Sequence, residues 1–112
     1  MEKILIVDDS VTVRKLLIHT LKPRNYTCVE ACDGFDALEK LAFNPDIRLV
    51  ISDLNMPNMD GIELIGTIRK NPQYRDLPII MLTTESSPEN RKLAFDAGAN
   101  LYLVKPSPAH II

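Results

Sequence analysis

Five short apolar runs alternate along the chain with segments in which apolar residues recur at helical spacing. Several of these runs are continuously apolar and rich in valine and isoleucine, which is typical of strands buried on both faces of a sheet. Regular alternation of strands and helices predicts right-handed crossovers and a parallel sheet with helices on both faces. We therefore expect an α/β fold, with strands at Ile4–Val7, Tyr26–Ala31, Leu49–Ser52, Pro78–Leu82 and Leu101–Val104.

Single apolar stripes between these runs predict four helices. They cover residues 13–21, 37–42, 61–68 and 90–97. Asp33 is expected to cap the second helix, and Ser86 with Glu89 fits a capping box at the start of the fourth. Asp60 is interpreted as an acidic residue in the first turn of the third helix, and Gly98 as the left-handed residue that ends the fourth.

The composition indicates one globular domain over residues 1–112, because 46% of the residues are hydrophobic and 25% are charged. A net charge of -2 argues against direct nucleic-acid binding, which needs a clustered positive field. The longest apolar runs have four residues, whereas a membrane span needs about 20. On one strand Cys28 and Cys32 would lie roughly 13 Å apart, too far for a disulfide. We therefore expect two reduced, partly buried thiols in a cytoplasmic protein.

Polar residues follow four of the expected strands. Asp8 and Asp9 come directly after the first strand, and Asp53 comes after the third. Thr83 follows the fourth strand and Lys105 the fifth. Because ligands of such sheets bind at the carboxyl ends of the strands, these side chains are expected to meet at one edge. Each residue alone has a more ordinary explanation, such as a helix cap or a surface charge, but their convergence favours a site.

The chemistry of this set points to magnesium and to phosphoryl transfer. Three carboxylates in one crevice repel each other, and one lysine cannot neutralise them, whereas a divalent cation with oxygen ligands can. A carboxylate can attack phosphorus, and the transition state spreads negative charge over three equatorial oxygens. We expect Asp8 and Asp9 to hold Mg²⁺, Lys105 and Thr83 to contact the phosphoryl oxygens, and Asp53 to be the nucleophile.

Four segments, Ile6–Ser10, Asp53–Gly61, Leu82–Thr84 and Gly98–Pro106, resemble the motifs of the receiver domain of two-component response regulators. They are most similar to those of chemotaxis-type single-domain regulators, and the resemblance covers almost the whole chain. It implies a flavodoxin-like, doubly wound sheet of five parallel strands in the order 2-1-3-4-5. It also implies a phosphorylation-activated signalling switch, which is not an enzyme beyond its own phosphorylation and dephosphorylation.

The resemblance assigns a role to each residue of the metal and phosphate site. Asp53 accepts the phosphoryl group from a phosphohistidine of a partner histidine kinase. Asp9 and Asp53 ligate Mg²⁺ directly, Asp8 acts through water, and the backbone carbonyl of Asn55 completes the protein ligands. Lys105 contacts the phosphoryl group and, before it arrives, Asp53.

The resemblance also implies a switch and its output. Thr83 moves toward the phosphoryl group, Tyr102 swings inward behind it, and the surface of the fourth helix and fifth strand changes for a downstream protein. Thr84 is expected to set access to the phosphate. Asn55 and Glu85 are expected to influence the attacking water, although a solvated loop position is an equally good interpretation of Glu85. The Lys105–Pro106 peptide is cis in this family.

Three alternative functions are less consistent with the sequence. A phosphatase of the haloacid dehalogenase type shares the aspartate, threonine, lysine and Mg²⁺, but it needs a second aspartate where this chain has Asn55. A flavodoxin-like binding module is disfavoured because Asp8 and Asp9 would repel a phosphate. A phosphorylation-independent receiver-like scaffold usually lacks one of the key residues, and here all are present.

The length is short for a receiver. Ser107 and Pro108 resemble a helix start, but the sequence stops at Ile112, so most of the fifth helix is missing from this chain. One apolar face of the sheet would then be open, which monomeric proteins avoid. We expect either that the natural chain continues or that a partner, such as a second copy in a dimer, covers this face.

Overall fold

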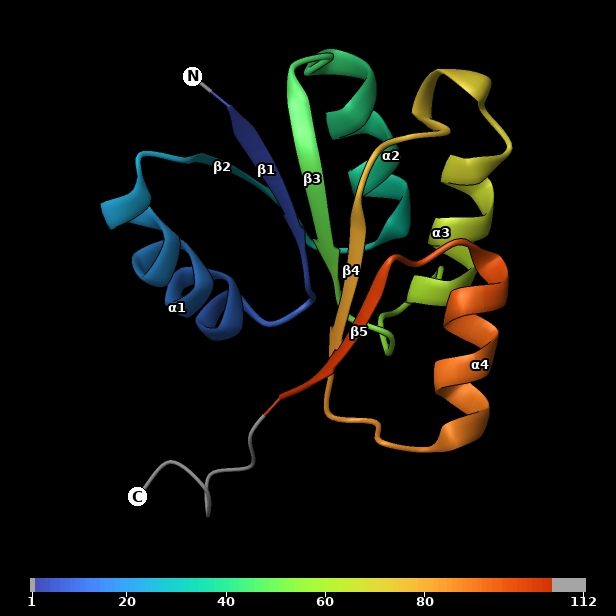
Figure 1. The fold of residues 1–112 in the computed structure, drawn as a ribbon. Helices are drawn as coiled ribbons and strands as arrows, with labels where there is room; N and C mark the ends of the chain where they lie inside the picture. The colour runs from blue at the N-terminus through green and yellow to red at the C-terminus, as the bar shows by residue number, and fades with distance from the viewer. Residues whose placement is uncertain (1, 106–112) are drawn as a thin grey trace, which may run out of the picture.

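The computed structural model describes residues 2–105. Five parallel strands form one sheet in the order β2-β1-β3-β4-β5 (Figure 1), which confirms the predicted α/β fold and strand order. The strands are β1 (Lys3–Val7), β2 (Thr27–Ala31), β3 (Ile47–Ser52), β4 (Ile79–Thr83) and β5 (Leu101–Val104). The helices are α1 (Val11–Leu21), α2 (Gly34–Phe43), α3 (Gly61–Arg69) and α4 (Pro88–Ala97), with short 3₁₀ helices η1 (Lys22–Arg24) and η2 (Pro72–Tyr74).

The helices form two layers, with α1 on one face of the sheet and α2, α3 and α4 on the other (Figure 1). The larger core lies between the sheet and α2–α4, where Leu5, Val50 and Met81 pack with Leu64 and Ile65. All five of these side chains are fully buried. Since burial of one such side chain contributes about 1.5–3 kcal/mol, this core fixes α3 and the central strands relative to one another.

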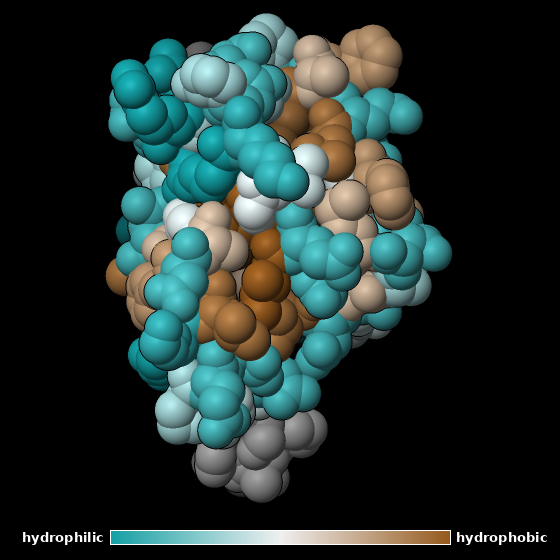
Figure 2. Space-filling model, turned by 90° about the vertical axis from the view of Figure 1, so that its right-hand side faces the viewer, coloured by the Kyte–Doolittle hydropathy of each residue, from teal (hydrophilic) through white to brown (hydrophobic). Residues whose placement is uncertain are grey.

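The opposite face of the sheet is covered less completely. A smaller core beneath α1 contains Ile4, Ile6 and Ile51. At the β5 edge, Leu101 and Leu103 are 51% and 47% exposed. Within residues 2–105, α1 is the only α-helix on this face, so the described part of the chain leaves apolar surface open there. Figure 2 looks onto the other side of the molecule, where α3 and α4 lie, and apolar surface runs down the centre of that side as well.

Two sequence expectations near the C-terminus lie outside the described residues. They are the helix start at Ser107 and Pro108 and the cis geometry of the Lys105–Pro106 peptide. In the described part of the chain, no helix is long and apolar enough to cross a membrane. Cys28 is partly buried and free, as predicted, whereas Cys32 is free but exposed because it lies just beyond the end of β2.

The start of α4 differs from the prediction by one residue. Ser87, and not Ser86, is the cap, and its hydroxyl accepts a hydrogen bond from the Asn90 N–H at 3.1 Å. Pro88 explains the shift, because proline suits the first helical position and the cap is therefore the residue before it. Glu89 stands two residues after this cap and not three, and its carboxylate accepts a hydrogen bond from the Ser87 hydroxyl at 3.2 Å, so the predicted capping box is not the arrangement found.

The other helix ends agree with the sequence except at Asp60. Asp33 caps α2 through the Asp36 N–H at 2.8 Å, as predicted. Asp60 was expected inside the first turn of α3 but is its cap, since its carboxylate accepts a hydrogen bond from the Glu63 N–H at 2.8 Å. Gly98 ends α4 with a φ of 123°, which confirms the need for glycine at this position.

Arg69 joins several elements at the end of the sheet where the strands begin. Its Nε and Nη2 donate to the Gly98 carbonyl at 3.1 and 2.9 Å, and Nη2 also donates to Asn100 Oδ1 at 2.9 Å. Its Nη1 donates to the Tyr74 carbonyl at 2.7 Å. Burial lowers the pKa of the Arg69 guanidinium, but an arginine stays charged at neutral pH. The C-terminal end of α4 is therefore linked to α3 and to the last residue of η2.

Candidate functional site

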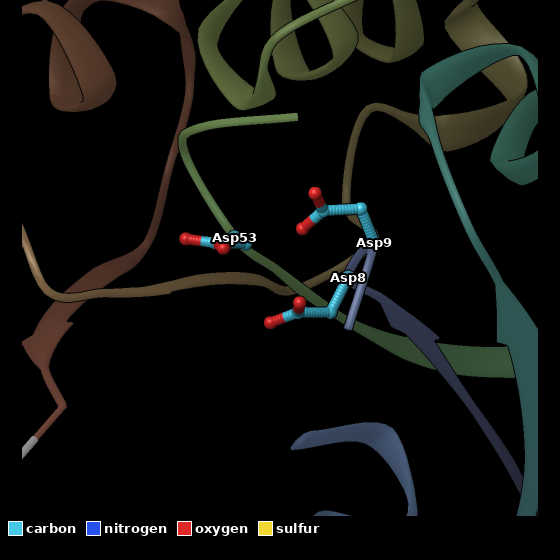
Figure 3. A group of neighbouring side chains, drawn as sticks. All are labelled: Asp8, Asp9 and Asp53. Atoms are coloured by element: carbon cyan, nitrogen blue, oxygen red, sulfur yellow. The ribbon is translucent and has the colours of Figure 1, made fainter. Parts of the chain in front are cut away.

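The predicted acidic residues lie together at the carboxyl ends of β1 and β3 (Figure 3). One carboxylate oxygen from each of Asp8, Asp9 and Asp53 lies within 4.8 Å of the others. The strands bring them there because β1 and β3 are neighbours, with Val7 opposite Ser52. The Asp53 N–H also donates to the Val7 carbonyl at 2.9 Å, which extends the pairing to the site itself.

Lys105 reaches this cluster from the end of β5. Its Nζ lies 2.8 Å from Asp8 Oδ2 and 3.4 Å from Asp53 Oδ2. The contact with Asp53 agrees with what the resemblance implies for the protein before phosphorylation. The shorter contact with Asp8 was not foreseen, and it compensates the charge of a carboxylate that is only 3% exposed.

The Asp53 carboxylate is oriented by two groups. Its Oδ1 accepts a hydrogen bond from the Leu54 N–H at 2.7 Å, and its Oδ2 faces Lys105. The loop after Asp53 is held in turn by the first residue of α3, because the Gly61 N–H donates to the Leu54 carbonyl at 2.7 Å. The position of the expected nucleophile is therefore fixed by backbone contacts and by the Lys105 ammonium group.

The donor set fits a hard divalent cation. Three carboxylates carry a charge of -3 and Lys105 carries +1, which leaves -2 to be balanced at the site. Within residues 2–105, the exposed Asp9 carboxylate makes no hydrogen bond or ion pair, so its oxygens are available as ligands. Carboxylate oxygens are the ligands that Mg²⁺ prefers, and Mg²⁺ usually binds through one or two of them together with water.

Thr83 and Tyr102 meet at the backbone of Glu85. The fully buried Thr83 hydroxyl accepts a hydrogen bond from the Glu85 N–H at 3.2 Å. The Tyr102 hydroxyl donates to the Glu85 carbonyl at 2.7 Å, and its ring lies 5.1 Å from the Arg91 guanidinium of α4. Tyr102 is 4% exposed, so its side chain lies inward in this structure. Burial, with the charge of Glu85, raises the pKa of Tyr102 and keeps its hydroxyl a donor.

Asn55 and Glu85 bridge the two loops beside Asp53. Asn55 Nδ2 donates to Glu85 Oε1 at 3.0 Å. Glu85 therefore uses its N–H, its carbonyl and its side chain in contacts, which argues against the interpretation of a solvated loop residue. Thr84 is exposed at the end of β4, next to the buried Thr83.

Sequence reasoning missed Arg14 and Glu30. The Arg14 guanidinium donates through Nη1 to the backbone carbonyl of Asp8 and through Nε to Glu30 Oε1 at 3.0 Å. The one available signal was Glu30, a charged residue inside the expected strand Tyr26–Ala31. A charge at such a position needs a partner, and Arg14 on the neighbouring helix supplies it.

Comparison with known proteins gives one family. Residues 4–112 match the family model of the response regulator receiver domain. The chain is 40% identical over 111 residues to the chemotaxis protein CheY1 of Helicobacter pylori, an alignment that covers 98% of this chain and 90% of that protein.

Solved structures agree with this match. The chemotaxis protein CheY4 of Vibrio cholerae has a TM-score of 0.88 and 42% identity, covering 99% of this chain and 92% of that one. The Mn²⁺-bound response regulator Rcp1 has a TM-score of 0.87 and 28% identity, covering 95% of this chain and 82% of that one. The gathered acidic residues, the strand order and these relatives agree, and the chain belongs to the response regulator receiver domain family, as a homologue of the CheY chemotaxis proteins.

Proposed function

We propose that this chain is a phosphorylation-activated switch of a two-component system, in which a histidine kinase transfers a phosphoryl group to Asp53 in a Mg²⁺-dependent reaction. One observation carries the proposal, namely the gathering of Asp8, Asp9 and Asp53 beside Lys105. The family and the CheY relatives support a signalling role in the cytoplasm over an enzyme that acts on external substrates. The alternative phosphatase remains disfavoured, because Asn55 stands where its acid/base aspartate is needed.

The phosphoryl transfer is a single displacement at phosphorus. A bond forms between a carboxylate oxygen of Asp53 and phosphorus, while the bond from phosphorus to the donor's imidazole nitrogen breaks and the nitrogen keeps the electron pair. Lys105, already 3.4 Å from Asp53 Oδ2, is placed to neutralise charge on the phosphoryl oxygens. The Thr83 hydroxyl is proposed to donate a charge-assisted hydrogen bond to one of these oxygens.

The metal would be held by the acidic residues. Asp9 and Asp53 are proposed as direct ligands, Asp8 as a ligand through water, and Asn55 as a ligand through its backbone carbonyl. Bound Mg²⁺ supplies positive charge to the phosphoryl oxygens. That the relative Rcp1 has been solved in a Mn²⁺-bound form supports a divalent cation here.

Metal binding should stabilise the fold. A cation that binds only the folded chain, present at about 100 times its dissociation constant, adds about 2.7 kcal/mol to the free energy of unfolding. We expect Mg²⁺ to raise the melting temperature of the wild-type chain measured by circular dichroism, and to raise that of Asp9→Asn much less. An equal rise in both proteins would contradict the assignment of Asp9 as a ligand.

The switch is proposed to run through Glu85. In the present structure Thr83 accepts the Glu85 N–H, so a Thr83 that turns to the phosphoryl group loses this contact. The Glu85 segment also holds Tyr102 of β5 and leads into α4, so its rearrangement changes the α4–β5 surface offered to a downstream protein.

A second copy of the chain could cover the open face beside α1, and this dimer is part of the proposal.

Substitution of the switch residues should leave phosphorylation of Asp53 intact but weaken the structural change that it causes in α4 and β5. We expect Thr83→Ala and Tyr102→Ala to form the phosphoryl adduct, while the amide chemical-shift changes that phosphorylation causes in α4 and β5 become several times smaller. Two-dimensional NMR of each phosphorylated protein measures this. Full wild-type shifts in both variants would exclude the proposed route.

The proposed function itself is tested by incubation with a small-molecule phosphodonor, with and without Mg²⁺, followed by intact mass measurement. We expect an adduct of one phosphoryl group that depends on Mg²⁺ and decays on standing. A chain that gains no adduct is not a phosphoacceptor. Sustained hydrolysis of phosphate esters would instead support the phosphatase.

A further inference from the structure

A hydrogen-bond network beside the site holds the backbone at the end of β1. The Arg14 guanidinium bridges the Asp8 carbonyl and the Glu30 carboxylate of β2, and only 12% of its side chain is exposed. Glu30 accepts a second contact from Lys15 at 3.1 Å. These two cations hold the pKa of Glu30 below its usual value, so it stays ionised at neutral pH. A charged group on β2 therefore fixes the guanidinium that binds the backbone of the acidic loop.

The Asp8 carbonyl that Arg14 binds fixes the backbone from which the Asp9 side chain projects. The Asp8 carbonyl and the Asp9 N–H belong to one planar peptide unit, so fixing one fixes the other. The Asp8 side chain is held separately by Lys105 and by the Ser10 N–H. The Asp9 carboxylate has no partner within residues 2–105, so its place at the cluster depends on the direction of its backbone and on its own rotamer.

We propose that Arg14, held in place by Glu30, is a positioning residue that orients Asp9 toward the divalent cation and so raises the affinity of the site for metal. The inference rests on the proposed metal site. It adds a residue that touches neither the metal nor the phosphoryl group. Groups that orient metal ligands in this way typically change metal affinity by about 10–100-fold.

The charge of Arg14 and its orienting contact are expected to change the metal affinity in opposite directions. As a positive charge near the site, the guanidinium repels a cation, so its neutralisation would strengthen metal binding if charge alone mattered. As an orienting group, its loss weakens metal binding. The sign of the change therefore distinguishes the two roles.

The test is isothermal titration of Mg²⁺ into the wild-type chain, Arg14→Met and Lys15→Met. We expect Arg14→Met to raise the dissociation constant about tenfold. Lys15→Met is the matched control. It also removes one positive charge that pairs with Glu30, but it leaves the contact between Arg14 and Asp8 in place. Its dissociation constant should stay at or slightly below the wild-type value, and urea unfolding without Mg²⁺ shows whether either variant is damaged.

Each result has one meaning. Wild-type or tighter binding of Mg²⁺ by folded Arg14→Met overturns the positioning role. If that variant does not fold, Arg14→Gln replaces it, since glutamine is too short to bridge Asp8 and Glu30, and wild-type affinity there overturns the role as well. A wild-type chain that binds no Mg²⁺ counts against the proposed function and removes the basis of this inference with it.

Discussion

Replacing Asp53 with asparagine is expected to abolish transfer of a phosphoryl group to this chain. The amide has no anionic oxygen to attack phosphorus, whereas its oxygen can still accept the hydrogen bond that Asp53 Oδ1 receives from the Leu54 N–H at 2.7 Å. After incubation with Mg²⁺ and a small-molecule phosphodonor, the intact mass should show the adduct in the wild-type chain and none in Asp53→Asn.

Stability separates this chemical loss from misfolding. Asp53→Asn removes one of three neighbouring negative charges, so without metal the variant should resist urea at least as well as the wild-type chain. Asp46→Asn is the matched control, because Asp46 is 51% exposed in its pair with Lys3, at the other end of the sheet, and this variant should keep the adduct. An adduct that persists in Asp53→Asn and maps to another residue would overturn the assignment.

Gly61→Ala is expected to lower the free energy of unfolding by about 3 kcal/mol and to slow phosphorylation. A Cβ at this position would lie 2.2 Å from the Asp53 carbonyl oxygen and 2.9 Å from the Met81 side chain. The start of α3 cannot retreat without losing the bond from the Gly61 N–H to the Leu54 carbonyl. The loop that carries Asp53 must therefore move. Urea unfolding and the rate of adduct formation measure the two effects.

Gly66 provides the control on the same helix. A Cβ at Gly66 would meet nothing within 4 Å, and alanine is favoured over glycine inside a helix by up to about 1 kcal/mol. Gly66→Ala should therefore stabilise the chain and leave its phosphorylation rate unchanged. If Gly61→Ala proved as stable as Gly66→Ala, the close approach of α3 to Asp53 would not hold in solution.

The fold was predictable because its main signals are periodic and local. The five apolar runs lie within one to two residues of the observed strands, since a strand buried on both faces needs a continuous apolar run. The strand order, in contrast, came from the resemblance, because periodicity does not say which strands pair. The misplaced cap at Ser86 shows the local limit, since adjacent serines differ only in their distance from Pro88.

The candidate site was predictable as a set of residues but not as a set of contacts. Parallel strands end at one edge, so Asp8, Asp9 and Asp53 could be expected to meet from their positions alone. Which carboxylate lies nearer to Lys105 depends on side-chain conformation and burial, and sequence reasoning foresaw only the contact with Asp53. The Arg14 contact depends on β2 lying beside β1, which brings Glu30 next to α1.

The Arg69 contacts have a mechanical consequence for α4. Its C-terminal end is pinned, because the Gly98 carbonyl accepts two hydrogen bonds from the guanidinium, whereas its N-terminal end follows the Glu85 segment. With 10 residues, α4 is about 15 Å long. If Glu85 rearranges as proposed, α4 would turn about its fixed end at Gly98, and the turn at Pro88 would move more than the end at Ala97. A partner protein that binds the first turn of α4 would then experience the largest displacement.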